Sequence, residues 1–479
     1  MSSGPRWMTR LARGLALAAL AALGGAFPAR ADLARLTADE AVRIALRENT
    51  SVYAAMKQVE QAEGTFKAAR SPLLPQLNVS GDLGRAHQGE QSSAYRLGAS
   101  VPATTTNSRS GSLTLAQELF NLQAWNGARE AARGVDASRA GELNTRLQIA
   151  LATKQQFYAL VRAKQLSGVN ADAARLDSST LVLTQGLFDV GSVPRTDLLK
   201  ARTQHAQSRL TLISAQHSVD LERLRLASLL GLADDRGLEV DETLAEDVPL
   251  PDSAAILETA YRNRPDLAQL VRQIQAAEAG LGSARASRYP TLGASLNIQK
   301  TIYTTRQDTF TAVGTSLVGL IPRVGRDTVL VPVYQSDTTL VPEQNFESRP
   351  FSWSVGARVS LPIFDGFSAK GRIQERQAEL DIQRRSLSQR RVDIALEVRQ
   401  AWLGLVEARE RARAAVEALT YAQESYELNN EKYRLGSNTL LELTTAEVQL
   451  TRSRSDLVEA RVGLQLARAG LDRALGLNP

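Results

Sequence analysis

Two short stretches of the chain have the same pattern: "FDVGSVPRTDLL" at residues 188–199 and "YRLGSNTLLELT" at residues 433–444. In each, an aromatic residue is followed three positions later by Gly-Ser, and an acid lies six residues after the glycine. Glycine adopts positive φ at little cost and often ends a helix. Thr439 and Glu442 have the spacing of a capping box, and Pro194 suits a first helical turn. Each stretch therefore predicts a turn between two helices.

The similarity between the two halves of the chain extends far beyond these turns. When the sequence is displaced by 245 residues, 158–232 aligns with 403–477 without a gap, and 20 of 75 paired positions are identical. Such self-similarity indicates one structural unit duplicated in tandem. The sequence predicts a signal peptide at 1–31, a first repeat at 32–232, an acidic linker at 233–251 and a second repeat at 252–479.

Long helices are predicted in both repeats. A helix from about Asn121 to Asp189 would be roughly 100 Å long at 1.5 Å per residue. Near the C-terminus, leucines and small residues alternate with a spacing of three and four, which predicts a continuous seam against a partner helix. These residues are Leu443, Ala446, Leu450, Ser453, Leu457, Ala460, Leu464, Ala467, Leu471 and Ala474. Each repeat is therefore predicted to contain a long helical hairpin.

Four segments between the helices alternate apolar and polar residues: "LNVSGDL" (77–83), "GSLTLAQ" (111–117), "TLGASLNIQ" (291–299) and "WSVGARVSL" (353–361). This pattern suits membrane strands with one face toward lipid, although a soluble sheet with one wet face is the alternative for any single strand. Four strands cannot close a barrel, and a bilayer leaves no sheet edge unsatisfied. Several chains would therefore have to share one barrel. Residues of about 300–350 predict an enlarged hairpin loop.

The N-terminus reads as a secretory signal peptide. Arg6, Arg10 and Arg13 precede the apolar run "LALAALAAL", and "ARA" at 29–31 is a small-x-small cleavage site. Without residues 1–31 the chain has 53 Lys and Arg against 51 Asp and Glu, so its charge gives no support to nucleic-acid binding. The absence of cysteine excludes disulfides and a lipid anchor on an N-terminal cysteine. An exported, unlipidated protein is expected.

Catalysis is not indicated by any motif. The three histidines are scattered, and the sequence contains no phosphate loop, nucleophile elbow or metal-ligand cluster. We therefore expect no enzyme activity, no metal and no cofactor. His205 lies at a seam position and is interpreted as packing, and Asp234-Asp235 as part of a solvated linker rather than a metal site.

In order, spacing and duplication, the sequence resembles the TolC-type outer-membrane efflux protein family over residues 36–478. The motifs that carry the resemblance are "LTADEAVRIALRENTSV" (36–52), "SPLLPQL" (71–77), "LFDVGSVPRTDLL" (187–199), "NRPDLAQL" (263–270), "SRYPTLGAS" (287–295), "LPIFDG" (361–366) and "YRLGSNTLLELTTAEVQL" (433–450). The resemblance implies a mainly α-helical protein with a β-barrel portion: a homotrimer whose twelve-stranded transmembrane barrel continues into a long periplasmic helical barrel. It also implies passive export for an efflux or type I secretion system, with an inner-membrane transporter, a periplasmic adaptor and outer-membrane lipid as partners.

By the same resemblance, the helix-turn-helix tips close the periplasmic entrance. Tyr433 matches a tyrosine that holds the entrance shut, and Glu442 matches an acid of the constriction. Asn438 stands where some members carry a bonding arginine, and Thr445 where a second acid is expected, so the gate bonds of such members do not transfer directly. The candidate tip residues for gating or adaptor contact are Gly191, Ser192, Asp197, Tyr433, Gly436, Ser437, Asn438, Glu442 and Thr445.

Simpler roles remain open for these residues. Asp197 and Glu442 would also serve as caps at helix starts, where an acid gains about 0.3–1 kcal/mol from the helix dipole. Tyr433 would also serve as hairpin packing. Two other protein classes are alternatives: a periplasmic adaptor, which needs no pair of equal hairpins, and a fibrous coiled-coil protein of the envelope, which would not explain four amphipathic strands.

Overall fold

The computed structural model describes residues 36–89, 91–92, 100–101, 103–232, 238–244, 249–252, 255–323 and 329–477, with only the backbone for 91–92, 100–101, 307–323 and 329–344. The predicted signal peptide and Asp234-Asp235 lie outside the described residues. The chain forms two compact units, one from Met1–Glu60, Ala137–Val271 and Ser386–Pro479, the other from Gln61–Asp136 and Arg272–Arg385. Each unit combines segments from both halves of the sequence.

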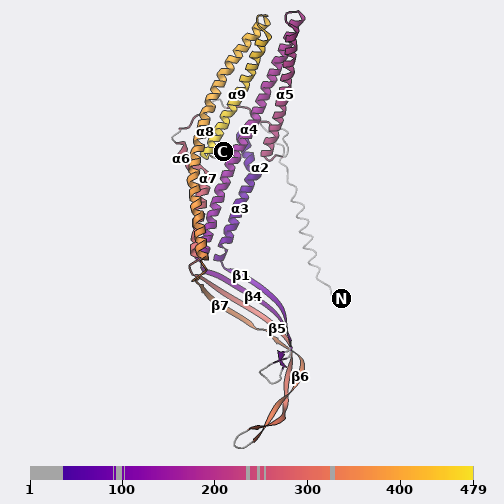
Figure 1. Cartoon of the computed structure of the whole chain (residues 1–479), viewed down its shortest axis with the longest axis vertical. Helices are drawn as coiled ribbons and strands as arrows, with labels where there is room; N and C mark the ends of the chain where they lie inside the picture. The colour runs from indigo at the N-terminus through magenta and orange to yellow at the C-terminus, as the bar shows by residue number, and fades with distance from the viewer. Residues whose placement is uncertain are drawn as a thin grey trace, which may run out of the picture. The chain divides into compact units, whose positions relative to one another are not determined.

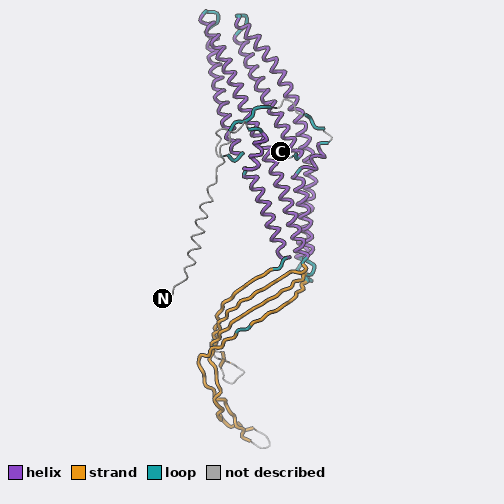
Figure 2. The backbone as a smooth tube through the Cα atoms, turned by 180° about the vertical axis from the view of Figure 1, so that it is seen from behind, coloured by secondary structure: helices purple, strands orange, loops and turns teal. Residues whose placement is uncertain are grey.

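The described helices are α2 (Ala38–Glu48), α3 (Thr50–Arg70), α4 (Leu122–Asp189), α5 (Arg195–Leu229), α6 (Ile256–Asn263), α7 (Pro265–Ala286), α8 (Ser368–Arg434) and α9 (Leu440–Leu475). The helix predicted for residues 121–189 is confirmed as α4, which contains 68 residues. Figures 1 and 2 show α4 with α5, and α8 with α9, as two long helical hairpins. Among the described helices, we find no apolar stretch of the length needed to cross a lipid bilayer.

Most of the leucine and small-residue seam of α9 is buried, as its spacing predicts, and Leu457 and Ala467 are partly buried. Leu443, Leu450, Leu464 and Leu471 are each at most 3% exposed. The last two leucines belong to a core cluster that also contains Val398 and Leu405 of α8. Burying a leucine side chain stabilises a fold by about 1.5–3 kcal/mol, so this seam contributes strongly to the α8/α9 hairpin.

A buried ion network lies at the start of α7. The Arg264 side chain is 4% exposed and donates to Asp266 at 2.8 Å and to Glu397 of α8 at 2.7 Å. Arg390 donates to the same Asp266 carboxylate at 2.7 Å. Burial alone would raise the pKa of Asp266, but the hydrogen bonds from the two guanidinium groups outweigh it and lower the pKa to about 2. The "NRPDLAQL" motif thus ties α7 to α8.

The second unit contains an antiparallel sheet in the order β1–β4–β5–β7. Its strands are β1 (Gln76–Gln88), β4 (Thr104–Phe120), β5 (Thr291–Arg323), β6 (Val329–Ser348) and β7 (Phe351–Ser360). β7 pairs with the first ten residues of β5, and β6 pairs with β5 beyond them. The described backbone of the segment predicted as an enlarged hairpin loop therefore continues as a two-stranded ribbon. A short pair, β2 (Gln91–Ser92) with β3 (Ser100–Val101), and the 3-10 turn η1 (Ser71–Leu73) complete the described elements.

Candidate functional site

The two predicted turns connect α4 to α5 and α8 to α9, and we call residues 190–194 and 435–439 the tip turns. Gly191 has φ 77° and Gly436 has φ 74°, as the sequence predicts. The Ser192 N–H donates to the Leu187 carbonyl and the Gly191 N–H to that of Phe188. The same bonds recur at Ser437 and Gly436, so both helices end in a Schellman motif.

The two helices that leave the tip turns begin differently. Thr439 and Glu442 form the predicted capping box, in which the Thr439 N–H donates to Glu442 Oε2 at 2.9 Å. The backbone bond from Thr439, followed by its side-chain bond, lowers the pKa of Glu442. Pro194 is the N-cap of α5, one position before the predicted first turn, because its ψ of 154° is extended rather than helical. Asp197 lies in the first turn of α5, 3.6 Å from Lys200 Nζ.

Tyr433 joins the two hairpins within one chain. It is 2% exposed, and its hydroxyl lies 3.1 Å from the Thr184 hydroxyl on α4. Burial raises the pKa of Tyr433. Around it lies a small core that includes Ala201 of α5 and Leu443 of α9. The side chain therefore packs in the hairpin core, as one of its two predicted roles requires, and also bonds across the hairpins.

Asn438 and Thr445, two of the predicted tip residues, bond within their own hairpin. Asn438 Nδ2 donates to Asn429 Oδ1 at 2.6 Å. Thr445 Oγ1 donates to the Leu441 carbonyl at 2.7 Å, and Ser437 Oγ to the Lys432 carbonyl at 3.0 Å. These bonds therefore stabilise the α8–α9 tip itself.

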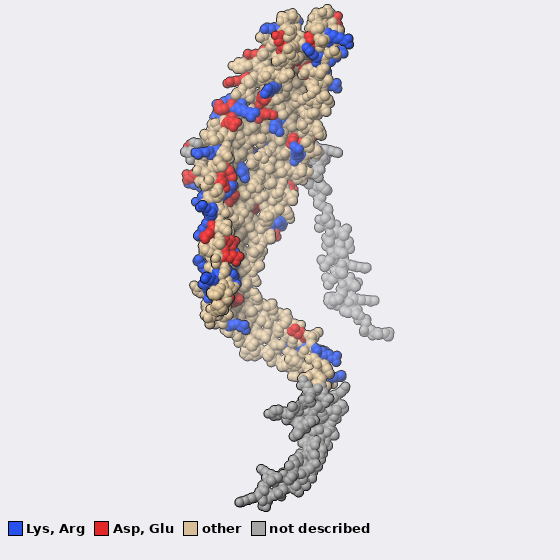
Figure 3. Space-filling model, in the orientation of Figure 1, with Lys and Arg blue, Asp and Glu red and all other residues tan. Residues whose placement is uncertain are grey.

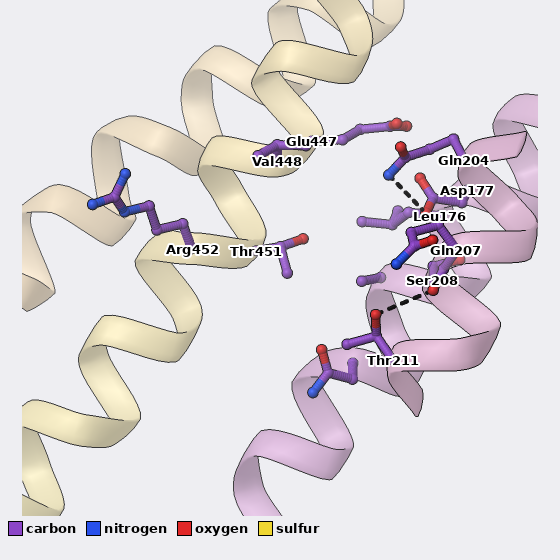
Figure 4. Close-up of a pocket in the computed structure, with 12 residues that line it drawn as sticks. Leu176, Asp177, Gln204, Gln207, Ser208, Thr211, Glu447, Val448, Thr451 and Arg452 are labelled. Carbon is purple, nitrogen blue, oxygen red and sulfur yellow. Dashed lines mark hydrogen bonds between the residues drawn. The ribbon is translucent and has the colours of Figure 1, made fainter. Parts of the chain in front are cut away.

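A second contact between the hairpins was not predicted from the sequence. Glu447 of α9 is 4% exposed and accepts a hydrogen bond from Thr180 of α4 at 2.6 Å. Burial raises the pKa of Glu447 to about 7, against the opposing effect of the Thr180 bond. Figure 4 shows Glu447 reaching toward Asp177 and Gln204, beside a cavity of about 280 Å³. The sequence feature that could have pointed to this contact is an acid directly after Ala446, a residue of the buried seam.

In the second unit, cross-strand pairing gathers apolar side chains on one face of the sheet. One row is Leu77–Leu115–Leu296–Val355 and the next is Val79–Leu113–Ile298–Trp353. Many of these side chains are exposed, including Val79 at 79% and Val355 at 70%. The intervening residues are polar and bond to one another, as in Ser80 to Ser112 at 2.7 Å. On the face shown in Figure 3, the described part of the sheet carries few charged side chains, whereas the helices carry many.

Comparison with known proteins identifies the family. Residues 41–232 and 256–477 match the family described as outer membrane efflux protein. The chain belongs to this family. Among curated relatives of the outer membrane efflux protein family, Nodulation protein T of Rhizobium leguminosarum bv. trifolii is 23% identical over 417 residues, covering 84% of this chain and 77% of that protein. The outer membrane protein TolC of Escherichia coli K12 is 24% identical over 385 residues, covering 79% and 69%.

Solved structures share the fold. The outer membrane protein VceC of Vibrio cholerae has a TM-score of 0.71 at 18% identity, covering 92% of this chain and 96% of that one. The outer-membrane channel OprN has a TM-score of 0.68 at 19% identity, covering 92% and 89%. The TolC-type fold expected from the sequence, mainly helical with a sheet portion, is therefore confirmed.

Proposed function

We propose that three copies of this chain form an outer-membrane exit channel for a tripartite efflux or type I secretion system. The observation that carries the proposal is the exposed apolar face of the β1–β4–β5–β7 sheet, whose charges are few and whose opposite face is polar. Lipid stabilises the first kind of face and a water-filled lumen the second. Family membership supports export as the function, and the relatives' names support an outer-membrane location.

The sheet also supports sharing of one barrel between subunits. In the described part of the chain, β1 and β7 each pair on one side only, so the sheet has two open edges. Unsatisfied edges cannot lie in a bilayer. Joining β7 of one copy to β1 of the next would close three sheets into a twelve-stranded barrel, with a lumen wider than one filled by its own side chains.

We assign the periplasmic entrance of the proposed channel to the two tip turns. Tyr433 and Glu442 act there, the first by its bond to Thr184 and the second by capping α9. The exposed tip residues Gly191, Ser192, Gly436 and Ser437 present the surface for a periplasmic adaptor, which links the channel to an inner-membrane transporter. The channel is a passive conduit, and the transporter supplies the energy.

Gel mobility in membrane extracts tests the proposal. A barrel trimer extracted in mild detergent should run as a compact oligomer when unheated and as a slower, denatured monomer after boiling. An adaptor or a fibrous coiled-coil protein would not show this heat-modifiable mobility. Recovery of the protein as a soluble monomer that needs no detergent would refute the channel.

A further inference from the structure

Glu447 is an acidic residue beside the apolar seam of α9, and its carboxyl is incompletely hydrogen-bonded. Oε1 accepts from Thr180 Oγ1 at 2.6 Å. Oε2 is buried and has no hydrogen-bond partner among the described residues. The contact links α9 of one hairpin to α4 of the other, and both helices also contribute to the tip core around Tyr433. Its state therefore affects how the two hairpins pack against each other.

The surroundings of Glu447 offer little to balance a negative charge. Asp177, its neighbour on α4, is 6% exposed and accepts from Gln204 Nε2 at 3.4 Å. The titratable and charged side chains around these two acids include His205 on α5, Tyr426 and Tyr433 on α8, and Arg452 and Arg454 on α9. Arg454 lies 3.6 Å from Asp172 of α4, so its charge is already paired. Figure 4 shows Arg452 directed away from the acids. No ion pair to Glu447 occurs within the described part of the chain.

Protonation decides which packing is stable. A neutral carboxyl can stay in this position, because it needs only ordinary hydrogen bonds and its O–H can itself donate. An ionised carboxyl with one bonded oxygen, beside a second carboxyl, is unstable without water. The adjoining cavity of about 280 Å³ has room for several water molecules, each of which needs about 30 Å³ in the liquid.

We propose that Glu447 and Thr180 form a proton-controlled latch between the two helical hairpins of each subunit. The protonated carboxyl keeps α9 packed on α4, and the ionised carboxyl is hydrated from the adjoining cavity and loosens that packing. The latch rests on the proposed function in one respect: loosened hairpins widen the entrance. Acid surroundings then favour the closed channel and alkaline surroundings the open one.

Channel conductance against pH tests the latch. Purified full-length protein in planar bilayers should conduct more as pH rises from 5 to 9, with a midpoint near pH 7. Glu447→Gln imitates the protonated carboxyl and should remove this transition, holding the conductance at its pH 5 value. Glu459→Gln is the matched control, because Glu459 is an exposed acid on the same helix, and its transition should equal that of the unaltered protein.

Two neighbouring substitutions should move the midpoint in opposite directions. Thr180→Ala removes the bond that favours the ionised carboxyl, so the midpoint should move to higher pH, and Thr180→Ser should restore it. Asp177→Asn removes the neighbouring negative charge, so the midpoint should move to lower pH. A purely structural role would not produce shifts of opposite sign. Equal midpoints in both variants would overturn the latch.

A distance measurement separates the latch from the channel function. The chain has no cysteine, so Val190→Cys and Leu435→Cys place spin labels only at the two exposed tips. With labelled subunits diluted by unlabelled ones, the label distance should increase from pH 5 to pH 9 and stay constant in Glu447→Gln. A constant distance in the otherwise unaltered protein would overturn the latch even if channels form. A changing distance without any conductance would uphold the latch and refute the channel.

Discussion

Replacing Asp266 by asparagine should measure how strongly the buried ion network holds α7 to α8. The carboxylate is 15% exposed, and its pKa falls from 3.8 to about 2 in the folded protein. One pKa unit corresponds to 1.36 kcal/mol, so the charged form contributes about 2.5 kcal/mol to the free energy of unfolding at neutral pH. Asp266→Asn should lose most of this contribution, since the amide keeps the volume but not the charge.

The pH dependence gives the sign of the effect. Because the folded pKa lies below the unfolded one, the contribution is complete above about pH 5 and disappears as pH falls through 3.8 toward 2. About half should remain at pH 3. The assay is urea unfolding in detergent, followed by the helical circular dichroism signal, at pH 7 and at pH 3.

Glu258→Gln is the control, because Glu258 pairs with Arg262 at 2.5 Å but both side chains are more than 70% exposed. Such surface pairs contribute about 0–1 kcal/mol. If Asp266→Asn and Glu258→Gln lowered the free energy of unfolding equally, or if the Asp266 effect were the same at both pH values, the reasoning from burial and charge would be refuted.

Three further predictions concern the tips and the sheet. Gly436→Val should abolish export while leaving oligomers intact on gels, because φ 74° strains a β-branched residue; normal export would contradict this. Tyr433→Phe combined with Glu442→Gln should raise single-channel conductance, since it removes a bond across the hairpins and the negative charge in the first turn of α9; unchanged conductance would speak against a gating role. Val355→Arg should prevent heat-modifiable oligomers, at a cost of about 2–4 kcal/mol on a lipid face, whereas Ser354→Arg on the opposite face should not.

Much of the fold could be predicted because its signals are local. The seam of α9 follows from a spacing of three and four, and each tip turn follows from one glycine beside a cap. The exposed apolar rows of the sheet follow from alternation within single strands. Their pairing across strands, such as Leu77 with Leu115, needed the register that only the structure provides.

The parts that could not be predicted depend on contacts between distant segments. Glu447 is buried because the face of α9 that carries it meets Thr180, 267 residues earlier in the chain. Asp266 pairs with Arg390 across 124 residues. Neither the spacing within α9 nor that within α7 contains this information, so the sequence alone did not single out Glu447 or Asp266.

The open edges of the sheet have a consequence for biogenesis. Before it joins a shared barrel, as proposed, a single copy exposes an apolar sheet face with two unpaired edges, and such edges readily pair with foreign strands. Chaperones that hold unassembled copies should therefore be needed in the envelope. Assembly of the oligomer should depend steeply on gene dosage. A variant whose sheet edges still pair but whose sheet is misfolded should be dominant-negative, because it would disrupt each barrel that it forms with intact copies.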